Sequence, residues 1–241
     1  MRLLFKAKFQ TVNTIKYTSN TKYINISCFL DMTGKVFTFP RESNTDHVRL
    51  NTGYDKSLSV LTICHRSFTD LTRNHALFSL ATPSRSNDIM IYYNSAPKLV
   101  EPHFCDAKAG YGGLDYAPNK WHSMCSTWDS NVGLIQLWFN GQPLTRKLGP
   151  GSTITGQPII ILGQDQDSYG GGFDPSQSFV GMMTDVHMWD HEISPCEIQK
   201  YMEELIFTPG NVLNWAALDF QTNGKALVEN KKNCNAKWFS K

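Results

Sequence analysis

The 241-residue sequence has little net charge, no closely paired cysteines and no long apolar run. Its 23 Lys and Arg residues against 21 Asp and Glu residues leave a net charge of +2, which is too small for the basic footprint of a nucleic-acid-binding domain. No stretch is apolar enough for a membrane span or for the apolar region of a secretory signal. The sequence therefore argues against nucleic acid as the main partner and against a transmembrane segment.

Cysteine spacing excludes a zinc ribbon or finger, because the sequence has no C-x-x-C pair. Disulfides or structural thiols remain, and six cysteines can pair in 15 ways, so spacing alone does not choose a pairing. The cysteines are Cys28, Cys64, Cys105, Cys125, Cys196 and Cys234.

Residues 1–32 differ from the rest of the chain in charge. This leader carries five basic residues against the single acid Asp31, a net of +4, so the remaining residues sum to −2. A non-native or alternative leader is the favoured interpretation, and a mitochondrial presequence is the alternative. We expect a leader at 1–32, one domain at 33–229 and a C-terminal tail at 230–241.

Short strands dominate from residue 35 onward. Leu134 to Gly141 alternates in polarity and ends in Asn140-Gly141, which favours a type I′ hairpin turn because both positions tolerate positive φ. Ser57 to Cys64 alternates as well, with Leu58 and Cys64 predicted on one face. Pro158 to Leu162 is a continuous Ile-rich run, typical of a strand buried on both faces.

One short helix is predicted, from Ser194 to about Leu205. Ser194 is a suitable N-cap, Pro195 a suitable first residue, and Glu197 stands where a capping box places its acid. Many strands with one late helix and no alternation of strands and helices favour an all-β fold. We expect an antiparallel two-sheet jelly-roll sandwich with one short helix.

A dense cluster of oxygen-bearing side chains follows the Ile-rich strand, from Gly163 to Gln177. Calcium accepts six to eight oxygen ligands in flexible geometry, so this composition suits calcium better than magnesium or zinc. An EF-hand is excluded because Tyr169 and Ser176 stand where that loop needs an oxygen ligand and a bidentate Glu. A solvated polar loop remains the alternative on composition alone.

Several segments resemble the pentraxin family. Cys125-Ser126-Thr127-Trp128-Asp129-Ser130 is similar to its signature His-x-Cys-x-Ser/Thr-Trp-x-Ser/Thr, although Ser123 stands in place of the first His. The resemblance runs from about Val36 to about Val228, and the chain is similar to short pentraxins such as those of fish. Further matching segments are Phe37-Thr38-Phe39-Pro40, Phe78-Ser79, Ile161-Leu162-Gly163-Gln164, Ser178-Phe179-Val180-Gly181, Met188-Trp189-Asp190 and Asn211-Val212-Leu213-Asn214-Trp215.

The resemblance implies two adjacent calcium ions on one face of a subunit. The implied ligands are Asn87, Asp165, Gln166 through its backbone carbonyl, Asp167, Asp174 and Gln177. This chain departs from relatives at Ser86, where they carry an aspartate before the asparagine. Asp88 compensates for that loss if the loop is shifted by one residue.

The resemblance also implies the ligand and one disulfide. Tyr92 matches an aromatic residue that covers the methylene groups of choline or ethanolamine, with a simple strand aromatic as the alternative. No acid occurs from Lys108 to Gly110, where relatives that bind choline carry a glutamate, so choline preference is in doubt. Cys64 and Cys125 match the disulfide of the family, and Cys196 and Cys234 are candidates for a second pair.

The implied function is calcium-dependent binding of phosphocholine or phosphoethanolamine on microbial or damaged-cell surfaces in innate immunity. The resemblance further implies secretion and a homopentamer, and it leaves engagement of complement components open. A calcium-dependent lectin for acidic glycans is the alternative. A jelly-roll glycoside hydrolase is disfavoured, because such enzymes need two carboxyl groups that flank the bond, whereas these acids lie in a glycine-rich loop. No enzyme activity is expected, and His187 is predicted to pack in a strand.

Overall fold

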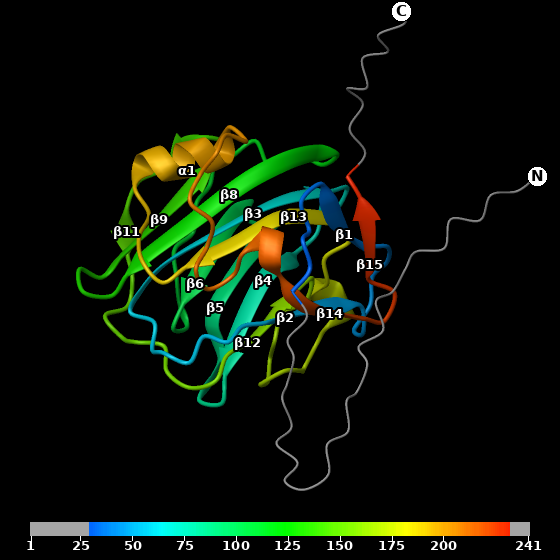
Figure 1. Cartoon of the computed structure of the whole chain (residues 1–241), viewed down its shortest axis with the longest axis horizontal. Coiled ribbons are helices and arrows are strands. Elements are labelled where there is room, and N and C mark those ends of the chain that lie inside the picture. Colours follow the sequence, from blue (N-terminus) through cyan, green and yellow to red (C-terminus); the bar gives the residue numbers. More distant parts are fainter. Residues whose placement is uncertain (1–28, 232–241) are drawn as a thin grey trace, which may run out of the picture.

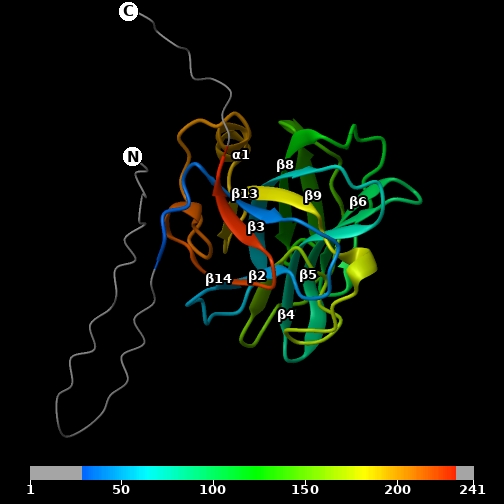
Figure 2. The same cartoon turned by 90° about the vertical axis from the view of Figure 1, so that its right-hand side faces the viewer.

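Two antiparallel sheets pack face to face in the computed structural model, which describes residues 29–231 (Figures 1 and 2). Most of the predicted leader, most of the tail, and Cys28 and Cys234 lie outside these residues. Every strand pair in the described part is antiparallel, so the predicted sandwich is confirmed. No helix in residues 29–231 is long and apolar enough to cross a membrane.

One sheet has eight strands and the other has seven. The first contains, in spatial order, β10 (Gln142–Pro143), β9 (Leu134–Phe139), β8 (Lys120–Asp129), β3 (Val60–Thr69), β13 (Gly181–Trp189), β1 (Lys35–Phe39) and β15 (Leu227–Asn230), and β11 (Lys147–Leu148) pairs with β9. The second contains β14 (Asp219–Asn223), β2 (His47–Asn51), β12 (Ile159–Leu162), β4 (His75–Thr82), β5 (Arg85–Asn94), β6 (Leu99–Phe104) and β7 (Ala107–Lys108). The helical elements are α1 (Pro195–Met202) and the short 3-10 turns η1 (Pro175–Gln177) and η2 (Trp215–Ala217).

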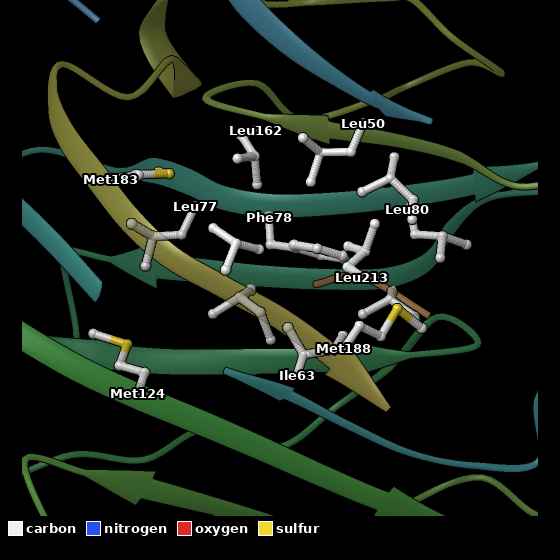
Figure 3. Packing of buried hydrophobic residues seen from close by; sticks show 14 of the residues in the cluster. Leu50, Ile63, Leu77, Phe78, Leu80, Met124, Leu162, Met183, Met188 and Leu213 are labelled. Carbon is white, nitrogen blue, oxygen red and sulfur yellow. The ribbon is translucent and has the colours of Figure 1, made fainter. Parts of the chain in front are cut away.

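The main core lies between the two sheets (Figure 3). Ile63 of β3 and Met188 of β13 meet Phe78 of β4 and Leu162 of β12 there, and each of the four is at most 1% exposed. Burial of one such side chain contributes roughly 1.5–3 kcal/mol. Successive side chains on a strand point to opposite faces of the sheet, so the neighbours of these core residues face outward, where a binding site can form.

The predicted Ile-rich strand is confirmed as β12, which lies between β2 and β4. Ile160 and Leu162 belong to the main core, whereas Ile159 and Ile161 point to the other face and are still buried. The loop after β12 covers this outer face. The predicted hairpin after β9 is also confirmed, since Asn140 and Gly141 have φ values of 47° and 84°.

The predicted strand at Ser57 to Cys64 is wrong in its start and in the face that it assigns to Leu58. Leu58 forms only an isolated bridge to Ile154, and β3 begins at Val60. Leu58 also packs in the main core, whereas Cys64 packs on the opposite side of the sheet beneath α1. The regular alternation fails because the chain is not yet in the β3 ladder at Leu58.

Helix α1 begins as predicted, with the Ser194 side chain accepting a hydrogen bond from the Glu197 backbone. It ends at Met202 and not near Leu205, because Glu204 adopts a positive φ of 57° that stops the helix. The capping box is incomplete, since one Glu197 carboxylate oxygen accepts from the Thr208 backbone at 2.7 Å. The helix buries Ile198 and Tyr201 against the eight-stranded sheet.

A disulfide joins β3 to β8 directly under α1. Cys64 and Cys125 are opposite each other in the strand register, their Cα atoms lie 4.1 Å apart, and both are buried, which confirms the predicted bond. Cys105 and Cys196 have no disulfide partner within residues 29–231. His187 packs in β13 as predicted, with its ring stacked on Trp189.

Candidate calcium and ligand site

The loop from Gly163 to Ser178 folds back over the outer face of the seven-stranded sheet. The buried side chain of Gln166 fixes its first half, because its amide nitrogen donates to the backbone oxygens of Ser79 at 3.2 Å and Ile159 at 3.1 Å. The amide oxygen of Gln166 accepts from the Gly170 backbone at 3.0 Å. The side chain of Gln166 is therefore used for structure, which leaves its backbone carbonyl for the predicted metal contact.

Glycine is needed where this loop closes on itself. Gly172 has a φ of 76°, and a Cβ atom there would lie 2.9 Å from Cβ of Asp167 and 3.0 Å from the Ser168 backbone nitrogen. An L side chain would be strained in this conformation and would also collide with the loop. Gly172 thus keeps the two halves of the loop close to Asp167.

Asp165 is the most buried acid of the loop, with 4% exposure. Burial, together with the negative charge of Asp167, raises the pKa of Asp165 to about 6. Its Oδ1 atom has no hydrogen-bond partner among the described residues. A cation at this position would offset both the desolvation and the repulsion between the two aspartates.

Four buried side-chain carbonyl or carboxylate oxygens in residues 29–231 have no hydrogen-bond partner. They are Asn87 Oδ1, Gln164 Oε1, Asp165 Oδ1 and Gln177 Oε1. Buried acceptors are normally satisfied, so these four exceptions need an explanation. Three of the four belong to predicted calcium ligands, and all four are the hard oxygen donors that calcium prefers.

Asp174 and Gln177 lie at the two ends of the turn η1. The Asp174 carboxylate caps this turn by accepting from the Ser176 backbone at 2.9 Å, and this contact lowers the pKa of Asp174. The Tyr92 hydroxyl lies beside the side chains of Gln177 and Asn74. An open pocket of about 430 Å³ adjoins them, lined by Arg73, Asn74, Tyr92, Ser95, Ala96, Asp174, Ser176 and Gln177.

The three predicted acidic ligands do not converge in the structure. Asp167 and Asp174 are exposed, and residues 29–231 contain no group of three His, Cys, Asp or Glu side chains that could hold a metal. Asp167 is close enough to Asp165 for its negative charge to raise the pKa of Asp165. The other implied ligands are side-chain amide oxygens and a backbone carbonyl. A search for grouped carboxylates therefore does not detect the implied calcium site.

Asn87 lies in β5, two strands away from β12 in the order β12-β4-β5. The suggestion that Asp88 replaces the missing acid at position 86 is wrong. The Asp88 carboxylate is 1% exposed and is held by Arg85 at 2.8 Å and Thr82 at 2.5 Å. Ser86 therefore remains a neutral residue beside Asn87.

Tyr92 and Met90 form a small apolar cluster with Ala76, apart from the main core and on the outer face of the sheet. Tyr92 is 8% exposed, so only a small part of its side chain reaches the pocket. Glu101 lies directly opposite Tyr92 in the β5–β6 register, and its carboxylate is 3.4 Å from the ammonium of Lys108. Sequence reasoning missed this acid because it searched only from Lys108 to Gly110.

A family model described as the Pentaxin family matches residues 35–230. The chain belongs to the pentraxin family. It is 39% identical to the serum amyloid P-component of Sus scrofa over 200 residues, which covers 83% of this chain and 88% of that protein. The human serum amyloid P-component is 38% identical over 213 residues, covering 87% and 93% of the two chains.

A solved pentraxin shares the same fold. The heptameric, serum-amyloid-P-like pentraxin from Limulus polyphemus superposes with a TM-score of 0.76 at 22% identity, covering 86% of this chain and 99% of that one. The pentraxin family is non-enzymatic, so this chain is not an enzyme. Members of the family typically bind calcium.

Proposed function

We propose that this pentraxin recognises phosphorylated head groups on microbial or damaged-cell surfaces in a calcium-dependent manner. The observation that carries the proposal is the set of unpartnered buried oxygens of Asn87, Asp165 and Gln177. All three belong to the ligand set implied by the family pattern, and their lack of hydrogen-bond partners supports a role as cation ligands. A solvated loop would leave such oxygens in contact with water.

Two calcium ions would be held by Asn87, Asp165, the Gln166 carbonyl, Asp167, Asp174 and Gln177. Bound calcium supplies positive charge that a phosphate oxygen can coordinate. The three aspartates contribute −3 against +4 from two ions, and the remaining +1 in a partly desolvated site favours an anionic ligand. Ligand binding then depends on calcium, because the aspartates alone repel a phosphate.

The head group would extend from the metal toward Tyr92 and Glu101. A negative charge opposite Tyr92 attracts the ammonium of ethanolamine or choline, and Glu101 supplies that charge. Lys108 supports the second candidate, a lectin for acidic glycans, because its exposed ammonium lies 3.4 Å from Glu101 and offsets the negative charge. Glu101→Gln distinguishes the two, since it should weaken phosphoethanolamine binding and leave binding of an acidic sugar unchanged.

Avidity is the physical reason to expect a ring-shaped homo-oligomer. Weak head-group sites gain affinity for a surface only when several are displayed together. We propose a secreted homopentamer, in which engagement of complement components would be a downstream step. Sedimentation velocity tests the assembly, and a stable monomer in millimolar calcium would contradict it.

Affinity capture tests the proposed function. The protein is applied with calcium to phosphocholine, phosphoethanolamine and acidic-sugar resins and then eluted with a chelator. We expect retention on a phosphorylated resin and release by the chelator. The matched control is Asp115→Ala, which removes an exposed aspartate that forms an ion pair with Lys120, and it should behave as wild type. Retention that ignores the chelator would refute calcium dependence.

A further inference from the structure

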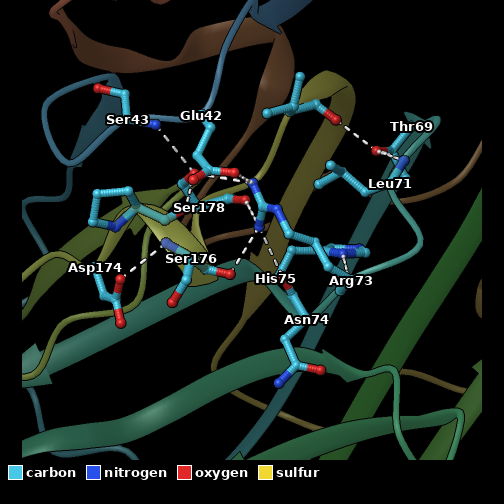
Figure 4. A network of polar contacts seen from close by, with 12 residues as sticks. Glu42, Ser43, Thr69, Leu71, Arg73, Asn74, His75, Asp174, Ser176 and Ser178 are labelled. Carbon is cyan, nitrogen blue, oxygen red and sulfur yellow. Dashed lines mark hydrogen bonds and ion pairs between the residues drawn. The ribbon is translucent and has the colours of Figure 1, made fainter.

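Arg73 connects the turn between β3 and β4 to the far end of the calcium loop (Figure 4). One terminal nitrogen of its guanidinium, Nη1, donates to the backbone oxygen of Ser176 at 2.9 Å and to that of Ser178 at 2.8 Å. Ser176 lies 103 residues later in the sequence. The loop is thus held across the fold by a residue that belongs to a different element.

Both terminal nitrogens of Arg73 are occupied by protein atoms. Nη1 also donates to the Asn74 backbone oxygen at 2.9 Å, and Nη2 lies 3.1 Å from the Glu42 carboxylate and 3.4 Å from Ser178 Oγ. Although Arg73 lines the open pocket, its terminal nitrogens bind protein atoms. Its role is therefore to hold the loop and not to bind an anionic ligand.

The turn η1 needs such support because it is only three residues long. In its two backbone hydrogen bonds, the Gln177 nitrogen donates to the Asp174 oxygen at 3.0 Å and the Ser178 nitrogen donates to the Pro175 oxygen at 3.1 Å. A single 3-10 turn is marginal, and the carbonyls at its end have no partner within the turn. Arg73 binds the carbonyls on both sides of Gln177, whose side-chain oxygen is one of the unpartnered acceptors.

The backbone of Arg73 is itself fixed to the interior. Its carbonyl lies 2.9 Å from Nδ1 of His75, and Nε2 of His75 lies 3.0 Å from the Tyr116 hydroxyl. Burial lowers the pKa of His75 to about 4, so the ring is neutral at pH 7. Because a carbonyl only accepts, Nδ1 carries the hydrogen and Nε2 accepts from Tyr116.

We infer that Arg73 is a positioning residue for the calcium site: it holds the backbone on both sides of Gln177, so that Gln177 and Asp174 present their oxygens to the metal. The inference rests on the proposed function, because it takes these two residues as calcium ligands. The Glu42 carboxylate offsets the charge of Arg73, which would otherwise repel calcium.

Two substitutions separate positioning from charge. Arg73→Lys keeps the charge, but a single nitrogen cannot reach Ser176, Ser178 and Glu42 together. We expect it to weaken calcium binding about tenfold in calorimetry, and Arg73→Gln to weaken it at least as much. If Arg73 acted only through its charge, Arg73→Lys would match wild type and Arg73→Gln would bind calcium more tightly. Arg146→Lys, an exposed arginine paired with Glu192, is the matched control.

Hydrogen exchange without calcium provides a readout that does not depend on the metal. In Arg73→Lys, amides in 174–178 should exchange several-fold faster than in wild type, with the rest of the chain unchanged. Unchanged exchange and unchanged calcium affinity would overturn this inference alone. A wild-type protein that binds no calcium would overturn the proposed function and the metal part of the inference together.

Discussion

The two outer faces of the sandwich differ in whether their buried groups have partners. On the helix face, α1 closes an apolar cluster over the Cys64–Cys125 bond, and the Tyr201 hydroxyl donates to the Asp185 backbone oxygen at 2.8 Å. On the loop face, the loop after β12 buries oxygens of Asp165 and Gln177 without partners. Apolar packing and a disulfide stabilise the helix face. On the loop face, the fold of the loop alone leaves buried oxygens without hydrogen-bond partners.

This difference separates stability from function. The helix face gains its free energy from apolar burial, which needs no ligand. The loop face keeps desolvated acceptors that cost free energy unless something binds them. Under the proposed function, residues 163–178 respond to a cation, whereas the helix face holds the subunit together.

The largest expected effect is on the loop face. Asp167→Ala should abolish calcium-dependent ligand binding, because it removes one of three carboxylates, while the calcium-free melting temperature stays close to that of wild type because Asp167 is exposed. Calorimetric calcium titration and thermal unfolding measure the two properties. Unchanged calcium affinity would mean that the oxygen cluster is an ordinary solvated loop.

Removing the disulfide of the helix face should lower stability and leave calcium affinity unchanged. Replacing Cys64 and Cys125 together by alanine opens a loop with a sequence separation of 61 residues, which should lower the free energy of unfolding by about 4 kcal/mol in the chain-entropy model. Urea unfolding measures this loss. Calcium affinity measured well below the melting temperature should be unchanged, and a parallel loss of calcium affinity would show that the faces are not independent.

Unpartnered atoms away from the loop face should behave as defects rather than as ligands. Both ring nitrogens of His65 lack partners among the described residues, and burial lowers its pKa to about 4. The unfolded chain takes up this proton near pH 6.5 and the folded chain does not, so His65 reduces stability as the pH falls from 6.5 toward 4, by about 3 kcal/mol at pH 4.

The variant His65→Leu tests this interpretation. It should leave calcium affinity unchanged and make the melting temperature fall less steeply between pH 7 and pH 4.5. His47→Leu is a control at a half-buried histidine on the opposite sheet. A pH dependence as steep as that of wild type would show that His65 is not the group responsible.

The smallest effect is expected at Ser86, beside Asn87. With Asp88 held by Arg85 and Thr82, no acid replaces the one missing at this position. Ser86→Asp should tighten the weaker calcium site several-fold, because calcium affinity follows ligand charge. Asp88→Asn should leave both sites unchanged but lower stability. Equal calcium isotherms for wild type and Ser86→Asp would remove the β5 segment from the site.

Local patterns predicted local structure well. The Asn140-Gly141 turn, the buried strand at Ile159–Leu162 and the cap at Ser194 follow from residue-level preferences, and all three are confirmed. The end of α1 could not be read from the sequence, because Glu204 adopts a positive φ that is uncommon for a residue other than glycine. The start of β3 at Val60 also could not be read from the sequence.

The candidate site was only partly accessible to sequence reasoning. Family pattern pointed to the loop and to Asn87, but it gave no hint that Glu101 faces Tyr92, which depends on the β5–β6 register. Arg73 was missed for a similar reason, since its contacts lie 103 and 105 residues away. Long-range contacts of this kind follow from the fold and leave no local signal.

Direct calcium titration of the intact wild-type protein tests the central claim. Isothermal calorimetry in chelator-treated buffer, followed by addition of phosphoethanolamine or phosphocholine, measures the stoichiometry and the coupling between metal and ligand. The account predicts two calcium ions per chain with unequal affinities, and heat of ligand binding only after calcium is added. Ligand binding of the same strength without calcium, or no uptake of calcium by the folded chain, would contradict it.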